Sequence, residues 1–341
     1  MSTENASSRL TFSIGTAGNN VGTSLMQKNQ DSVIKILDDG STKHNNTGNL
    51  YTKGIEVFKE NKESIYQNVR HFLESSTVNR IDETNLINSM AGGLGSSVPL
   101  EIINLLTDSF GFNKTIFSNA LLWGNNDSVL ESYNQLLYIS DVHKRVDLIT
   151  CFDNSFYDSS QEFQSGLPDG EPGFKAVNDE ISDSLINAFL NKSEKLVNLK
   201  SYDGSLKFYI PSTSISEKRL FENQSQLFNV KSKSQNNLVY HGNIIFSSKV
   251  DKMLLFDINK LLYANDSMKI CSFVQQENSR KNYLVSNNNG ILDSLQNLLL
   301  NFEKFFEKGA FLQYFLESVS RDEFLERKEI LLNIIEEYRK L

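Results

Sequence analysis

Short apolar runs alternate with amphipathic stretches over the first 200 residues. Short apolar runs between turn signals predict buried strands, whereas apolar positions repeating at helical spacing predict helices. We expect strands at residues 10–14, 33–37, 85–90, 115–122 and 146–152, and helices at residues 21–28, 60–73, 99–106 and 127–139. This alternation is typical of a parallel sheet covered by helices on both faces.

The remaining chain has a different organisation. Residues 161–173 are rich in Gly, Pro and acids and predict a loop, and the pattern that follows predicts a long central helix. Further strands are expected at residues 207–210, 238–241, 243–246, 253–256 and 269–274, and from residue 290 the pattern is helical again. We therefore expect an α/β fold with a Rossmann-like domain at 1–173, a central helix and loop at 174–204, a smaller α+β domain at 205–290 and long C-terminal helices at 291–341. The last helix, 321–341, carries an apolar stripe formed by Phe324, Ile330, Ile334, Tyr338 and Leu341.

The charge of the chain narrows the possible partners. It contains 34 basic and 42 acidic residues, a balance of −8, which argues against direct binding of nucleic acid because such binding needs a basic surface. The polar start does not resemble a signal peptide and no apolar run is long enough to span a membrane, so we expect a cytoplasmic protein. The spacing of the cysteines and histidines predicts neither a disulfide framework nor a metal site, and we interpret Cys151 and Cys271 as reduced core residues.

A first glycine turn follows the first expected strand and begins a helix. It contains Gly15, Thr16, Ala17, Gly18 and Asn19. Glycines there allow backbone N–H groups to approach a phosphate, and a helix N-terminus favours an anion. Such turns also serve tight packing, and a dinucleotide-dependent oxidoreductase with Asp38 as its ribose acid fits the same pattern.

A second glycine turn follows the third expected strand. It contains Gly92, Gly93, Leu94, Gly95 and Ser96. Two such turns on parallel strands can hold one polyphosphate from two sides, whereas an oxidoreductase of that kind needs only one. A purely structural turn with Ser96 or Ser97 as a helix cap is the alternative.

Several strings match one family in order. Residues 14–22 read I-G-T-A-G-N-N-V-G, residues 91–97 read A-G-G-L-G-S-S, residues 126–134 read N-D-S-V-L-E-S-Y-N, and residues 151–154 read C-F-D-N. Residues 310–314 and 322–324 read A-F-L-Q-Y and D-E-F. These strings resemble I-G-Q-C-G-N-Q-I-G, G-G-G-T-G-S-G, S-D-T-V-V-E-P-Y-N, C-I-D-N, A-F-L-H-W-Y and M-E-F of the tubulin/FtsZ superfamily, and the matches cover most of the chain.

The resemblance implies a GTP/GDP site, with Mg²⁺ accompanying the nucleotide. Asp127 and Glu131 would bind the ribose hydroxyls, Asn154 and Asn178 would bind the guanine edge, and Phe174 would stack on the base. Taken without the resemblance, the two acids also fit a solvated helix face, the two amides fit caps or surface positions, and Phe174 fits a core position.

The resemblance also implies catalysis in trans, because the family's N-x-D-x-x-E/D loop completes the site of the next subunit. Here Asn198 and Asp203 match the two ends, with Asp203 as general base, while Lys200 replaces the middle acid. An Asp-Gly turn at Asp203 is the alternative. Leu94 replaces the signature threonine, Ser97 replaces the last glycine, and the expected third phosphate loop at residues 54–61 contains one glycine.

These matches imply a GTPase that polymerises head to tail. The length of the chain favours TubZ or the phage tubulins of the PhuZ type, which position plasmid or phage DNA, so that a DNA-binding adaptor of the TubR type is the implied partner. A polymer-forming paralogue with weak or no hydrolysis and a dinucleotide-dependent oxidoreductase are the alternatives.

Overall fold

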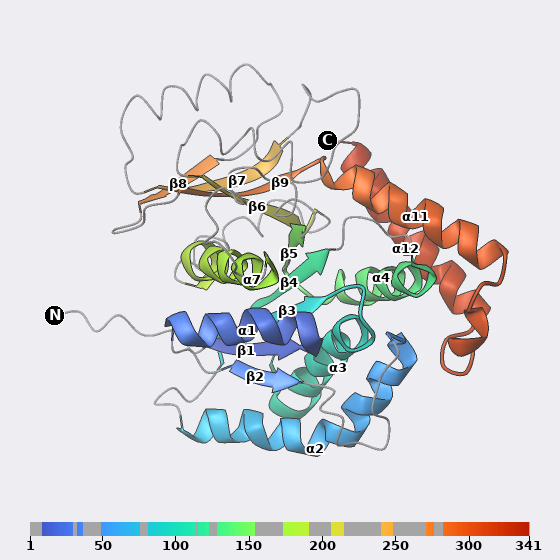
Figure 1. The fold of residues 1–341 in the computed structure, drawn as a ribbon, viewed down its shortest axis with the longest axis horizontal. Helices are drawn as coiled ribbons and strands as arrows, with labels where there is room; N and C mark the ends of the chain where they lie inside the picture. Colours follow the sequence, from blue (N-terminus) through green and yellow to red (C-terminus); the bar gives the residue numbers. More distant parts are fainter. Residues whose placement is uncertain are drawn as a thin grey trace. The chain divides into compact units, whose positions relative to one another are not determined.

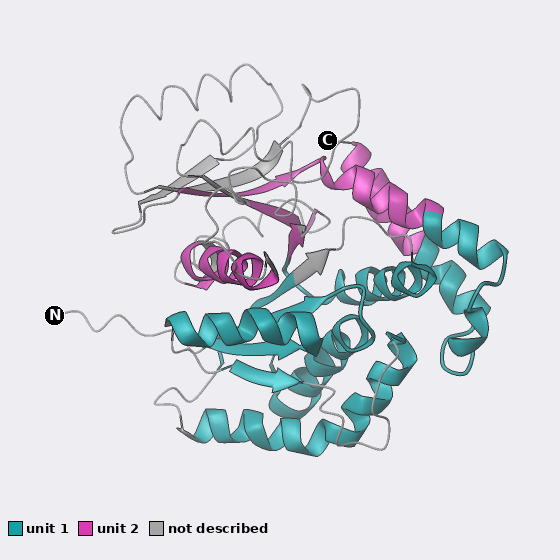
Figure 2. Cartoon of the chain, in the orientation of Figure 1, with its two compact units in different colours: residues 1–121, 126–149, 301–328 teal, residues 122–125, 150–300, 329–341 magenta. Residues whose placement is uncertain are grey.

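The computed structural model describes residues 9–29, 33–36, 49–75, 81–112, 115–122, 128–153, 173–190, 206–214, 240–247, 271–275 and 282–340. The chain divides into two compact units (Figure 2). Unit 1 contains residues 1–121, 126–149 and 301–328, and unit 2 contains residues 122–125, 150–300 and 329–341. The domain boundaries expected from the sequence stay a prediction.

The sheet of unit 1 is parallel. Its strands β1 (Arg9–Ile14), β2 (Val33–Ile36), β3 (Glu83–Ser89) and β4 (Thr115–Leu122) lie in the order β2-β1-β3-β4 (Figure 1). The connection from β1 to β2 leads towards the β2 edge of the sheet, whereas the connections from β2 to β3 and from β3 to β4 lead towards β4. Ligands of such sheets bind outside the carboxyl ends of the strands at this switch point, which here lies between β1 and β3.

Four helices cover this sheet. They are α1 (Gly15–Asn29), α2 (Tyr51–Ser75), α3 (Gly93–Phe110) and α4 (Val129–Val142). Right-handed crossovers place α1 on one face and the other three on the opposite face, where α3 packs between α2 and α4 (Figure 1). The predicted α/β class is thus confirmed.

The helix starts differ from those expected. Both glycine turns are already helical, because α1 begins at Gly15 and α3 begins at Gly93. Glycines and small polar residues in a buried first turn carry no apolar periodicity, so the pattern concealed them. Pro99 therefore lies inside α3 rather than in its first turn. The C-terminus of α3 follows ordinary rules, since Gly111 has a left-handed φ of 61° and its N–H bonds the carbonyl of Thr107.

The last helical segment of unit 1 is held by aromatic packing. An aromatic cluster joins α4 to the end of α11 (Ile291–Glu307) and the start of α12 (Arg321–Arg339), and it consists of Tyr133, Phe302, Phe306, Phe315 and Phe324. Ser320 and Glu323 form a reciprocal capping box at the start of α12, with N···O distances of 2.7 and 3.2 Å. The expected apolar stripe of α12 is largely confirmed, because Phe324, Ile334 and Tyr338 are buried.

Unit 2 contains a mixed sheet. The order β6-β9-β7-β8 joins β6 (Phe208–Ser214), β9 (Asn282–Asn288), β7 (Tyr240–Ser247) and β8 (Cys271–Gln275), with β9 antiparallel to both neighbours and β7 parallel to β8. The described parts of the strands expected at 238–241 and 243–246 belong to one strand, β7, and the strand expected at 253–256 lies outside the described residues. β9 was not expected, because its sequence N-Y-L-V-S-N-N is rich in amides although every residue is buried.

A short 3-10 helix, η2 (Leu312–Tyr314), lies between α11 and α12, and three further elements complete the described fold. Helix α7 (Gly173–Ser184) continues into a π-helical segment, Leu185–Leu190, which confirms the first part of the expected central helix. Strand β5 (Leu148–Asp153) contains Cys151, which is buried and unbridged as expected. The hydroxyl of Tyr338 on α12 accepts the N–H of Phe208 at 2.9 Å, inside unit 2.

Candidate functional site

The two glycine turns of unit 1 lie in contact at the switch point of the sheet. Gly15 has a left-handed φ of 72°, and a Cβ placed on it would lie 3.5 Å from the backbone nitrogen of Gly95 and 3.6 Å from the Cβ of Leu94. In α1, Gly18 abuts the backbone of Ile87 so closely that a Cβ would overlap it. Glycine at these positions lets the N-termini of α1 and α3 approach each other.

The N-terminus of α2 reaches the same place. A Cβ on Gly93 would lie 2.6 Å from the carbonyl oxygen of Leu50, and one on Gly54 would lie 2.5 Å from the carbonyl oxygen of Gly93. Residues 54–61, expected from the family resemblance to be a third phosphate loop, are therefore part of a helix, and their one glycine is a packing contact against α3. The chain immediately before the helix, at Asn49 and Leu50, is what borders the second glycine turn.

The start of α3 presents backbone donors. The first intrahelical bond of α3 runs from the N–H of Ser96 to the carbonyl of its N-cap, Gly92, at 3.0 Å. The N–H groups of Gly93, Leu94 and Gly95 therefore have no acceptor within the helix. Gly92 carries no side chain that could cap them.

The charge distribution favours an anion there. The first turns of α1, α2 and α3 contain no acidic residue, whereas α4, α11 and α12 each have at least one. A helix N-terminus carries about half a positive charge, which an acid in the first turn would partly neutralise. In a chain with a net charge of −8, three neighbouring helix starts thus keep their positive ends.

Buried amide side chains hold the turns in place. Asn19 donates at 2.8 Å to the carbonyls of Gly15 and Ile36 and accepts at 2.9 Å from the hydroxyl of Ser13. Asn88, at the end of β3, donates at 2.9 Å to the carbonyl of Gly95. One amide hydrogen of Asn19 therefore binds the first turn and the other binds the end of β2.

Ser96 and Ser97 do not cap α3. The alternative interpretation of the second turn, in which one of these serines is the helix cap, is therefore wrong. The hydroxyl of Ser96 donates to the carbonyl of Gly92 at 2.7 Å, and that of Ser97 donates to the carbonyl of Gly93 at 2.8 Å. Both bonds run back along the first turn of α3, so they leave its N–H groups to other acceptors.

The remaining candidate residues are more scattered. Glu131 lies half-buried in the first turn of α4, in unit 1. Phe174 and Asn178 lie on α7 in unit 2, where Phe174 is 63% exposed and therefore not a core residue. Thr16 is exposed and Ala17 half-buried at the start of α1. Asp127, Asn154, Asn198 and Asp203 lie outside the described residues.

The structure also identifies a residue that sequence reasoning missed. Asn134 of α4 is fully buried, and its side chain bonds both Ala91, just before the second glycine turn, and Asn49, before α2. The sequence signal for Asn134 was its position at the end of the family-like string at residues 126–134. In that string the resemblance implied roles only for Asp127 and Glu131.

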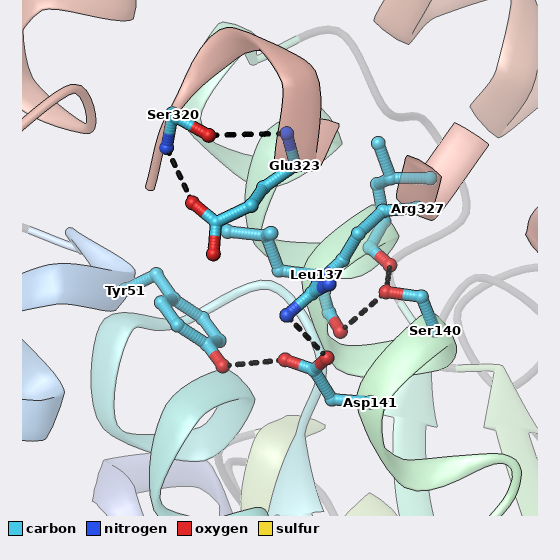
Figure 3. Close-up of polar contacts among 8 residues, drawn as sticks. Tyr51, Leu137, Ser140, Asp141, Ser320, Glu323 and Arg327 are labelled. Atoms are coloured by element: carbon cyan, nitrogen blue, oxygen red, sulfur yellow. Dashed lines mark hydrogen bonds and ion pairs between the residues drawn. The ribbon is translucent and has the colours of Figure 1, made fainter. Parts of the chain in front are cut away.

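A charged cluster borders the start of α2 (Figure 3). Asp141 accepts a hydrogen bond of 2.8 Å from the hydroxyl of Tyr51. It also forms an ion pair with the guanidinium of Arg327, with an N···O distance of 2.9 Å. Burial raises the pKa of Asp141, an effect that Arg327 and the bond from Tyr51 partly oppose. Burial and the charge of Asp141 also raise the pKa of Tyr51. At neutral pH Tyr51 is thus a neutral donor.

Two absences hold for the described part of the chain. None of its helices combines the length and the apolarity that a membrane crossing requires. Its His, Cys, Asp and Glu side chains form no group of three that could hold a metal ion.

Comparisons with known proteins show what the chain is similar to. Residues 36–159 match the family model of the Tubulin/FtsZ family, GTPase domain. The tubulin gamma chain of the nucleomorph of Guillardia theta is 22% identical over 330 residues, covering 86% of this chain and 76% of that protein. The tubulin gamma chain of Candida glabrata is 22% identical over 346 residues, covering 85% and 72%. Over residues 36–159 the chain is therefore similar to the GTPase domain of the tubulin/FtsZ family.

Proposed function

We propose that the chain binds GTP and GDP with the phosphates at the convergence of the α1, α2 and α3 N-termini. The observation that carries this proposal is that three neighbouring helix starts have no acid in their first turns, and that the N–H groups of Gly93–Gly95 at the start of α3 have no acceptor within the helix. Phosphate is the ligand that such an arrangement favours. Gly15, Thr16, Ala17, Gly18, Asn19, Gly92, Gly93, Leu94, Gly95 and Ser96 form this phosphate site.

The rest of the nucleotide would bind residues assigned by family resemblance. Asp127 and Glu131 bind the ribose, Asn154 and Asn178 bind the guanine, and Phe174 stacks on it; its 63% exposure is compatible with this role. Mg²⁺ would bind mainly through phosphate oxygens, as is usual for this ion in nucleotide sites.

We further propose that hydrolysis occurs between copies of the chain. Asp203 of one copy, with Asn198, completes the site of the next copy and orients the attacking water. A contact of this head-to-tail kind does not close on itself, so it produces a filament. The proposed domains are a nucleotide-binding domain at 1–173, a central helix and catalytic loop at 174–204, an activation domain at 205–290 and C-terminal helices at 291–341.

The biological role proposed is the positioning of plasmid or phage DNA, as in TubZ and the phage tubulins, through a DNA-binding adaptor of the TubR type. The acidic balance of −8 supports an adaptor rather than direct DNA contact. The two similar proteins named above are themselves tubulin gamma chains.

One experiment tests binding, assembly and hydrolysis together. The purified chain is sedimented with GTP, with GDP and with a slowly hydrolysed GTP analogue, while phosphate release is recorded. We expect pelleting and phosphate release with GTP, and for Asp203→Ala we expect pelleting with release reduced at least about a hundredfold. A wild-type chain that pellets but releases no phosphate would instead establish the alternative of a filament protein without hydrolysis.

That alternative is supported by specific departures from the family pattern. Leu94 brings no hydroxyl to the phosphate site, and Lys200 replaces an acid of the catalytic loop. The oxidoreductase alternative predicts binding of NAD and none of GTP, and it assigns no role to the second glycine turn.

A further inference from the structure

Asn134 uses the hydrogen-bonding capacity of its amide on two separate segments. Its Nδ2 donates to the carbonyl of Ala91 at 2.7 Å and to the carbonyl of Asn49 at 2.6 Å, while its Oδ1 accepts the N–H of Tyr51 at 3.2 Å. Ala91 immediately precedes the second glycine turn, and Asn49 and Tyr51 flank the start of α2. One fully buried side chain therefore fixes the distance between two helix N-termini.

The segment that it holds is strained. Asn49 has a φ of 60°, one of two positive values at non-glycine residues in the described part of the chain. A residue in the left-handed region costs free energy and persists where its surroundings enforce it. The bonds of Asn134 to the carbonyl of Asn49 and the N–H of Tyr51 supply this enforcement on both sides of Leu50.

Helix α4 secures Tyr51 at a second point. Asn134 and Asp141 are seven residues apart and so lie on the same face of α4, two turns from each other. Asn134 accepts the backbone N–H of Tyr51, and Asp141 accepts its hydroxyl at 2.8 Å (Figure 3). The backbone and the side chain of the first residue of α2 are thus both bound to one rigid helix.

We propose that Asn134 is a positioning residue for the nucleotide phosphates. It holds the start of α2 at the spacing from Gly93–Gly95 at which the two helix N-termini act on the same polyphosphate. This inference rests on the proposed function. It assigns a role to a side chain whose hydrogen-bond partners described above are all protein atoms. Asparagine is required because a carboxylate of the same shape would face two carbonyl oxygens without a proton to donate.

A purely structural role would have a different signature. Loss of a buried amide destabilises the fold whatever its purpose, but a structural residue would not change the relative affinities of nucleotides that differ only in phosphate number. A positioning residue for phosphates must change them, since the base and ribose contacts are the same in GTP and GMP.

The test compares Asn134→Ala and Asn134→Asp with Ser140→Ala. Ser140 is a matched control because it is buried on the same helix and its hydroxyl donates to the α4 carbonyls of Leu136 and Leu137. Equilibrium binding of GTP, GDP and GMP is measured for each variant with its melting temperature. We expect the ratio of GTP to GMP affinity to fall about tenfold in both Asn134 variants and to stay within about twofold of wild type in Ser140→Ala. An unchanged ratio in folded Asn134 variants would overturn the proposal.

A measurement on the wild-type chain covers the case in which the Asn134 variants do not fold. Hydrogen exchange of residues 49–54 and 91–97 is compared with GTP, with GMP and without nucleotide. The proposal expects GTP to slow both segments together and GMP to leave both nearly unchanged, and it is refuted if GTP slows only one of them. If the wild type binds no GTP at all, the proposed function itself fails, which separates the two outcomes.

Discussion

The side-chain amide of Asn88 donates to the carbonyl of Gly95, the one carbonyl in α3 that Pro99 leaves without its backbone partner. In a regular helix the N–H of residue 99 would bond this carbonyl, but proline has no N–H. Strand β3 therefore supplies the donor that the helix lacks. This relationship explains how a proline is accommodated within two turns of a buried helix start.

A double-mutant cycle tests this substitution of donors. Asn88→Ala should lower the free energy of unfolding by about 1–3 kcal/mol, because it leaves a buried carbonyl unsatisfied. In a Pro99→Ala background the restored backbone N–H can bond Gly95, so the same change should cost about 1 kcal/mol less. Urea denaturation of the four chains measures both values. Strict additivity would show that Asn88 and Pro99 act independently.

The glycines of the second turn should differ sharply in tolerance. A Cβ on Gly95 would overlap the carbonyl of Ser89, whereas a Cβ on Gly92 would have no atom within 4 Å. Gly95→Ala is expected to cost about 1–3 kcal/mol of stability through overpacking against backbone. Gly92→Ala, at a φ of −79°, should cost less than about 1 kcal/mol. Thermal denaturation without nucleotide makes the comparison, and equal losses would contradict it.

The charged cluster predicts opposite pH dependences for two acids. Burial raises the pKa of Asp141 above its ordinary value of 3.8. The stability that this residue contributes is therefore full at pH values below 3.8, and it is lost as the pH rises through the raised pKa of the folded state. Hydrogen bonds from Ser320 lower the pKa of Glu323, so its contribution is present above 4.5 and is lost as pH falls.

Asp141→Asn and Glu323→Gln remove these titrations one at a time. As the pH rises from about 4 to about 7, the wild type should lose stability relative to Asp141→Asn and gain stability relative to Glu323→Gln. Denaturant midpoints measured across this range check both signs. A shift of the same sign for both acids would show that the cluster is not arranged as described.

A buried hydroxyl predicts the behaviour of unit 2. Tyr338 accepts the N–H of Phe208 at 2.9 Å, and burial raises the pKa of the hydroxyl well above 10. Tyr338→Phe keeps the ring but leaves that N–H without its partner, which should cost about 1–3 kcal/mol. The exposed Tyr314 is the control, since Tyr314→Phe should change stability by less than about 0.5 kcal/mol. Denaturant titration of both variants measures the difference.

Most of the unit 1 strands followed from local pattern. The strand expected at residues 115–122 agrees with β4, and the others differ by a few residues at their ends. These strands carry apolar residues at or near alternate positions or in short groups between turn signals, so little outside information is needed to recognise them. β9 is the counterexample, because its burial depends on neighbours that its amide-rich sequence does not reveal.

The candidate site was predictable in its glycines but not in its supports. Gly15 and Gly95 lie in recognisable turns, and their contact follows from the strand order. Asn88 and Asn134 are single amides whose role depends on carbonyls distant in sequence, such as that of Asn49, which is 85 residues from Asn134. No periodicity in the sequence marks such a residue, because its hydrogen-bond partners come close to it only in the folded chain.

The lack of acids in the first turns of α1, α2 and α3 has a thermodynamic consequence. Without an internal counterion at these turns, a bound oxyanion should stabilise the fold, so its melting temperature is linked to the buffer. Phosphate and sulfate should stabilise the apo chain at concentrations where chloride does not. Stabilities of variants at these turns are therefore comparable only at one fixed anion composition.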